Sequence, residues 1–120
     1  MKVLSREAFL KMPAGTIFAK GQPWAFEQMC FKGTSFENDF NYLNLVDIES
    51  HDSGQWADRL QEMLDHGVSY PIDMLGFGRD GMFNDNDLFL VFEKDDLIEL
   101  RGKIDEAIVG VPRDGNYDDA

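Results

Sequence analysis

The sequence predicts a single α+β domain, an antiparallel sheet of about five strands with two or three packing helices. Three observations support this class. Short apolar segments are separated by turns rich in Gly, Pro, Asn and Asp, as in sheets built from consecutive antiparallel strands. Two longer segments have the apolar spacing of amphipathic helices. No Gly-rich fingerprint joins a strand to a helix, which argues against a dinucleotide-binding fold.

The first half of the chain is predicted to form one short helix and three strands. Ser5 is a good N-cap, and Pro13 ends the helix that begins there. Strands are predicted over residues 16–20, 24–32 and 40–48, where aromatic and β-branched residues are frequent. The second of these strands has apolar residues on both faces, so we expect it to be covered on both sides.

The second half begins with the strongest helix signal of the chain, over residues 54–66. Trp56, Leu60 and Leu64 recur at helical spacing, and the segment is bounded by Ser53 as N-cap and by Gly67. A glycine at that end accepts the left-handed conformation in which helices often stop.

Two further strands and a last helix follow. Strands are predicted over residues 68–77 and 88–93, with a polar loop over 76–87 between them. The last helix starts at Asp95 or Asp96, and its apolar stripe is expected to pack on the sheet.

Length and composition indicate one globular domain. The 120 residues suit a single domain over 1–108, followed by a mobile acidic C-terminal tail over 109–120. A hydrophobic fraction of 43% with ten Phe excludes general disorder. No apolar run approaches the roughly 20 residues of a spanning helix, and no signal-peptide pattern is present. We therefore expect a cytoplasmic protein in which Cys30 is a small buried hydrophobe.

The formal charge of −12 is unevenly distributed along the chain. Residues 1–36 carry five basic and two acidic groups, residues 37–96 carry three and fifteen, and residues 97–120 carry three and six. Residues 37–96 therefore carry a net charge of −12, equal to that of the whole chain, because the net charges of +3 and −3 in the two flanking segments cancel. Because phosphates repel carboxylates, direct nucleic-acid binding is not expected.

An acidic surface predicts a basic partner, although solubility alone also explains such a charge. The first hypothesis is a non-enzymatic protein that engages a basic host protein through its acidic middle. Its candidate contact residues are the carboxylates Asp39, Glu49, Asp52, Asp80, Asp85 and Asp87.

A second hypothesis is a protein that binds or sequesters a small molecule such as a nucleotide. Stacking of the base is assigned to Trp24, Phe26, Tyr42 and Tyr70, and contact with phosphate to Lys20 or Arg79. For Arg79, however, an internal ion pair with neighbouring carboxylates is favoured over a phosphate contact.

No motif predicts catalysis, a metal site or a cofactor. The loop over 76–87 has many oxygen ligands but lacks the spacing of an EF-hand. Asp47, Glu49, His51 and Asp52 lie together in sequence but have no second nearby His to complete a metal site. We expect a protein that is not an enzyme and that needs no cofactor.

Three segments carry a resemblance to a known group of proteins. They are residues 10–18 (LKMPAGTIF), 78–83 (GRDGMF) and 88–96 (LFLVFEKDD), which resemble small proteins of tailed bacteriophages and prophages with no assigned activity. The resemblance implies an accessory protein in the cytoplasm of an infected or lysogenic bacterial host. By size and charge alone, inhibitors of host defence (anti-restriction or anti-CRISPR proteins) are the nearest analogy. A third hypothesis is a structural or assembly component of the phage.

Overall fold

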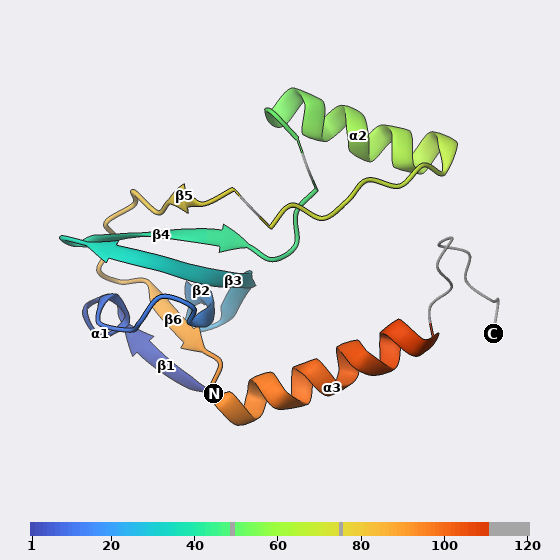
Figure 1. Cartoon of the computed structure of the whole chain (residues 1–120). Coiled ribbons are helices and arrows are strands. Elements are labelled where there is room, and N and C mark those ends of the chain that lie inside the picture. Colours follow the sequence, from blue (N-terminus) through green and yellow to red (C-terminus); the bar gives the residue numbers. More distant parts are fainter. Residues whose placement is uncertain (49, 75, 111–120) are drawn as a thin grey trace.

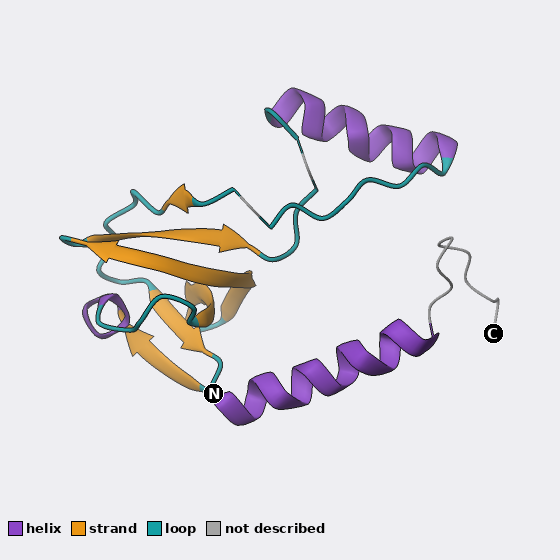
Figure 2. Ribbon diagram, viewed as in Figure 1, coloured by secondary structure: helices purple, strands orange, loops and turns teal. Residues whose placement is uncertain are grey.

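The computed structural model describes residues 1–48, 50–74 and 76–110, and contains one antiparallel sheet of six strands and three helices (Figure 1, Figure 2). The strands are β1 (Lys2–Ser5), β2 (Ile17–Gln22), β3 (Ala25–Phe36), β4 (Asp39–Asn44), β5 (Gly78–Arg79) and β6 (Leu88–Val91). The helices are α1 (Arg6–Leu10), α2 (Ser53–His66) and α3 (Lys94–Gly110). The α+β prediction is confirmed, with six strands in place of about five.

The strand order is β1-β6-β2-β3-β4-β5, so the apolar strand β6 lies inside the sheet between β1 and β2. From β2 to β5 consecutive strands pair as an antiparallel meander. The β2–β3 register shifts between Ala19 and Gly21, so Lys20 faces two residues of β3, Glu27 and Gln28. Such a bulge changes the direction of side chains at that point of the sheet.

The core is built from four phenylalanines that come from four elements. Phe9 of α1 stacks on Phe89 of β6 with ring centroids 4.2 Å apart, and it meets Phe18 of β2 and Phe40 of β4 at 4.6 and 5.1 Å. Helix α1 is held there by its predicted cap, since the Ala8 amide donates to the Ser5 hydroxyl at 3.3 Å. Burying each ring stabilises the fold by about 3–5 kcal/mol relative to alanine.

The structure contains one strand that was not predicted and lacks one that was. The sequence did not predict β1, because its four residues become a strand only by pairing with β6, far along the chain. The predicted strand over 68–77 does not form; the described part of that segment makes a single bridge, Ile48 with Ile72. Strand β5 begins only after it, at Gly78.

The two long helices do not cover the sheet as expected. Both project away from it on the same side, and neither contains a buried residue (Figure 1). The cap of α2 is Asp52 rather than Ser53, because the Asp52 carboxylate accepts from the Gln55 amide at 2.8 Å. Gly67 ends α2 in the left-handed conformation, with φ of 65°, as predicted. Helix α3 continues to Gly110, and the rest of the predicted tail, 111–120, lies outside the described residues.

Candidate functional site

Three of the predicted contact carboxylates lie in a buried ion cluster. Asp39 at the start of β4 and Asp80 after β5 both bind Arg6 of α1, whose side chain is only 3% exposed. The Arg6–Asp80 distance is 2.9 Å, and Lys20 of β2 binds the other Asp80 oxygen at 3.1 Å. Lys20 also lies 3.9 Å from Asp87. Three carboxylates therefore fasten α1, β2 and the loop 76–87 together.

Arg79 completes this cluster, which confirms the internal ion pair predicted for it. Its Nε donates to Asp39, and its guanidinium lies 5.6 Å from the ring centroids of both Phe36 and Phe83. Burial opposes ionisation of Asp39, but hydrogen bonds from Arg79 and from the amides of Phe40 and Gly81 outweigh it and lower the pKa of this carboxyl. Asp39 therefore stays ionised at neutral pH.

The cluster corrects the acidic-loop version of the first hypothesis. The side chains of Asp39, Asp80 and Asp87 are at most 8% exposed and are paired, so they do not present charge to a partner. Asp85 is exposed in the same loop, and Asp52 is exposed at the start of α2. Glu49 lies outside the described residues.

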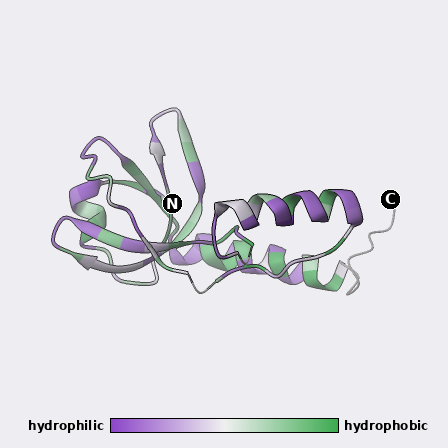
Figure 3. Cartoon of the chain, turned by 90° about the horizontal axis from the view of Figure 1, so that it is seen from above, coloured by the Kyte–Doolittle hydropathy of each residue, from purple (hydrophilic) through white to green (hydrophobic). Residues whose placement is uncertain are grey.

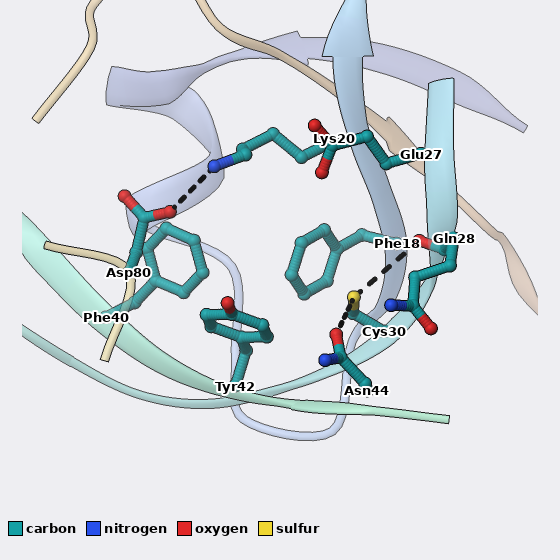
Figure 4. A pocket seen from close by; sticks show the side chains of 9 residues that line it. All are labelled: Phe18, Lys20, Glu27, Gln28, Cys30, Phe40, Tyr42, Asn44 and Asp80. Atoms are coloured by element: carbon teal, nitrogen blue, oxygen red, sulfur yellow. Dashed lines mark hydrogen bonds and ion pairs between the residues drawn. The ribbon is translucent and has the colours of Figure 1, made fainter. Parts of the chain in front are cut away.

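An open cavity of about 140 Å³ lies beside this cluster, and we call it the aromatic cup (Figure 4). The buried rings of Phe18 and Phe40 form its floor beside the partly buried Tyr42, and the three ring centroids are 5.8 to 6.5 Å apart. Strands β2, β3 and β4 supply most of the lining, and the β2–β3 bulge brings both Glu27 and Gln28 to it. The complete lining is Phe18, Lys20, Glu27, Gln28, Cys30, Phe40, Tyr42, Asn44 and Asp80.

Cys30 in the cup is not an activated nucleophile. Burial, with a smaller contribution from Glu27, raises the pKa of its thiol to about 11. The thiol therefore stays protonated at neutral pH, and it donates to Asn44 Oδ1 at 3.3 Å. Burial also raises the pKa of Tyr42, so its hydroxyl remains a hydrogen-bond donor. The predicted burial of Cys30 is confirmed.

The residues of the small-molecule hypothesis do not converge on one site. Only Lys20 and Tyr42 line the aromatic cup. Trp24 is 81% exposed in the β2–β3 turn, and Tyr70 lies beside α2, where its hydroxyl donates to Glu62. Phe26 is half-buried on β3 outside the cup lining, and Arg79 is held by Asp39. Lys20 and Arg79, the predicted phosphate contacts, each form an ion pair with a carboxylate.

A second depression adjoins the cup where the chain passes from β4 to α2, and we call it the α2 groove. Its volume is about 290 Å³, and it shares Gln28 and Asn44 with the cup. Trp56 and the exposed Val46 supply apolar surface there, and Asp47 and Asp52 supply two carboxylates. The remaining lining residues are Ser50 and Ser53.

Hydrogen bonds fix the shape of the α2 groove. The indole Nε1 of Trp56 donates to Asp47 Oδ1 at 2.8 Å, and the Asp73 amide donates to the Asp47 carbonyl at 3.0 Å. Asp52 Oδ1 caps α2 through Gln55. Within the described ranges, no protein donor meets the second carboxylate oxygen of either Asp47 or Asp52. Each aspartate therefore keeps an oxygen for a ligand.

Several residues of these sites were not anticipated from the sequence. Arg6 lies in a segment predicted only as a short helix, and Gln28 and Asn44 lie in segments predicted only as strands. Gln28 and Asn44 come together because β3 pairs with β4, which local patterns do not encode. Asp47 and Asp52 were noted together in the sequence around His51, and both line the groove.

Across residues 1–48, 50–74 and 76–110, no three His, Cys, Asp or Glu side chains converge as a metal site requires. Within the same ranges, none of the helices has the length and apolar content needed to cross a membrane. Comparison with protein families, curated proteins and solved structures gives no match for this chain.

Proposed function

We propose that the protein is a non-enzymatic binding protein that captures a basic protein through the α2 groove. The observation that carries the proposal is that Trp56 shares the groove with two aspartates, Asp47 and Asp52, each of which has one oxygen that no donor among the described residues meets. The proposal keeps the basic protein partner of the first hypothesis. It moves the acidic contact surface from the loop 76–87 to the groove.

The chemistry of the groove suits an arginine or lysine side chain of the partner. A guanidinium over the face of an indole is favourable by cation–π attraction, and carboxylates bind it with charge-assisted hydrogen bonds. Trp and Arg are also the residues that most often dominate the binding energy of protein interfaces. The exposed Val46 adds apolar surface for the aliphatic stem of the same side chain.

The charge around the groove favours the same partner. The segment 50–74, which we call the α2 arm, contains five carboxylates against the single cation Arg59. Arg59 lies 4.7 Å from the ring centroid of Tyr70, so it is held on the arm. A negative field of this kind steers a basic protein toward the groove and raises its association rate.

The resemblance to phage proteins supports a host protein as the partner. In this proposal the chain acts in the cytoplasm of an infected or lysogenic bacterium, and its carboxylates stand in for the phosphates that a basic host protein normally binds. Inhibition of a host-defence protein is the form of accessory function that this arrangement fits best.

The test uses Trp56 as its own reporter. Trp24→Phe leaves Trp56 as the single tryptophan, and an arginine-rich decapeptide serves as the probe. We expect the peptide to change the Trp56 emission at about 20 mM salt and to lose affinity as salt rises. Asp47→Asn combined with Asp52→Asn should weaken binding by about tenfold or more. Asparagine is also a good N-cap, so α2 is preserved.

The matched control is Asp58→Asn with Asp65→Asn, which makes the same change of charge on a part of α2 outside the groove lining. We expect this control to weaken binding by less than about threefold, through long-range attraction alone. Equal losses in the two double variants would mean that net charge and not the groove binds the peptide. An absence of any change in Trp56 emission at low salt would also contradict the proposal.

A further inference from the structure

The aromatic cup offers hydrogen-bonding groups that the fold leaves unused. Asn44 Oδ1 accepts from the Cys30 thiol, so its amino group Nδ2 faces no protein acceptor within the described part of the chain. Among those same residues, the side-chain carboxamide of Gln28 and the hydroxyl of Tyr42 also have no protein partner (Figure 4). A carboxamide presents a donor and an acceptor side by side, which matches the edge of a nitrogen heterocycle.

The size and walls of the cup fit one planar ring system. Its volume of about 140 Å³ is close to the roughly 150 Å³ of a cavity that holds benzene. Phe18, Phe40 and Tyr42 meet one another edge to face, with interplanar angles of 52° to 80°. Aromatic walls attract a planar ring by stacking or edge-to-face contact, and they do so for any heteroaromatic base.

The charges around the cup select against phosphate. Lys20 is the only cation in the described lining, and Asp80 holds its ammonium at 3.1 Å. Burial of Lys20 opposes its charge, but the Asp80 contact outweighs this and raises the Lys20 pKa, so Lys20 stays charged with its ammonium held by Asp80. Glu27 adds a further negative charge at the lining. A phosphate group would therefore meet net repulsion.

From these three features we infer that the aromatic cup binds an uncharged nucleobase, free or as a nucleoside, through the ring and not through a phosphate. Gln28 and Asn44 read the edge of the ring, Tyr42 contacts the ring, and Phe18 and Phe40, which are 2% and 1% exposed, form the floor beneath it. The cup and the α2 groove are neighbouring sites, and Gln28 and Asn44 line both of them.

The experiment titrates the intact protein with adenosine, guanosine, cytidine and uridine, with the four free bases, and with the four 5′-monophosphates, by isothermal calorimetry. We expect at least one nucleoside or base to bind with a dissociation constant below about 1 mM. Its monophosphate should bind at least about threefold more weakly, because Glu27 repels it. Comparison of nucleoside with free base shows whether the sugar contributes.

Variants then locate the binding in the cup. Gln28→Ala and Asn44→Ala should each weaken binding about fivefold or more, since each removes a hydrogen-bonding edge. Asn86→Ala, a carboxamide lost from an exposed loop, should leave it unchanged. Gln28 is exposed, so its variant tests the site even where Asn44→Ala perturbs folding.

Three results would overturn the inference. The first is that no nucleoside or base at 5 mM gives a heat of binding. The others are that the monophosphates bind more tightly than the nucleosides, or that Gln28→Ala leaves the affinity unchanged. Asp52→Asn serves to separate the two sites, because it should leave nucleoside binding intact while it weakens the arginine-rich peptide. Failure of one site therefore does not imply failure of the other.

Discussion

At the scale of single residues, the buried ion cluster explains how so acidic a chain folds its sheet. Asp39, Asp80 and Asp87 are taken out of water, which is costly unless each carboxylate keeps an opposite charge. Arg6, Lys20 and Arg79 supply these charges from α1, β2 and β5. Arg6, Asp39 and Asp80 have side chains at most 3% exposed, so removing one of them leaves opposite charges without their full compensation inside the fold.

Replacing Asp39 by Asn tests this sensitivity. Arg6 and Arg79 would lose a shared counter-charge, and we expect the free energy of unfolding at pH 7 to fall by about 3–5 kcal/mol. The folded-state pKa of Asp39 is lowered, so its stabilisation is complete above the ordinary carboxyl pKa and is lost as pH falls through the lowered value. Urea unfolding at pH 7 and below pH 3 measures both effects.

The difference between wild type and Asp39→Asn should therefore shrink in acid. Asp85→Asn is the control, because this exposed side chain should change stability by less than about 0.5 kcal/mol. A gap between Asp39→Asn and wild type that stays constant from pH 7 to the acid limit would show that lost packing, and not lost charge, causes the destabilisation.

At the scale of elements, the chain divides into parts that the sequence specifies locally and parts that it does not. Helix α2 and strand β6 were predicted because a repeating apolar pattern, a terminal glycine or a continuous apolar run lies within each of them. Strand β1 depends on β6, and the segment after Gly67 stays out of the sheet although it alternates like a strand. The α2 groove is largely local, because its lining residues from Asn44 to Trp56 follow one another along the chain, and only Gln28 is added by the pairing of β3 with β4.

Gly67→Ala tests whether α2 is energetically separate from the core. Alanine in the left-handed conformation of Gly67 costs about 1 kcal/mol, and the space around the new Cβ is open. Because no residue of α2 is buried, we expect faster amide hydrogen exchange in α2 and an unchanged midpoint of global urea unfolding. The two measurements together separate local from global opening.

Gly21→Ala is the contrasting variant. A Cβ on Gly21 would lie 2.2 Å from the Ala25 carbonyl oxygen, inside the β2–β3 hairpin, so this substitution should lower the global midpoint. If Gly67→Ala lowered the global midpoint as much as Gly21→Ala does, the α2 arm would be part of the cooperative core.

At the scale of the whole molecule, charge and shape are linked. The three internal ion pairs are neutral, so the net charge of −12 belongs to the rest of the chain. The Cα radius of gyration is 16.8 Å, against about 14 Å for a compact domain of this length. Helices α2 and α3 project from the sheet, and both carry apolar residues along their exposed length (Figure 3). Spreading the carboxylates over these helices reduces their mutual repulsion.

This charge predicts a stabilising effect of salt. Repulsion among exposed carboxylates disfavours the folded state, and raising the ionic strength from 0.01 to 0.15 M shortens the screening length from about 30 to about 8 Å. The buried cluster is screened much less, so its stabilisation is retained. We expect added sodium chloride to raise the thermal midpoint by about 4–8 °C, which corresponds to roughly 1 kcal/mol.

A double variant, Glu99→Gln with Asp105→Asn, removes two exposed carboxylates of α3 and tests the same repulsion. It should raise the midpoint at low salt and reduce the effect of added salt. A midpoint that falls with salt would instead mean that favourable surface pairs, such as Lys103 with Glu106 at 2.9 Å, outweigh the repulsion.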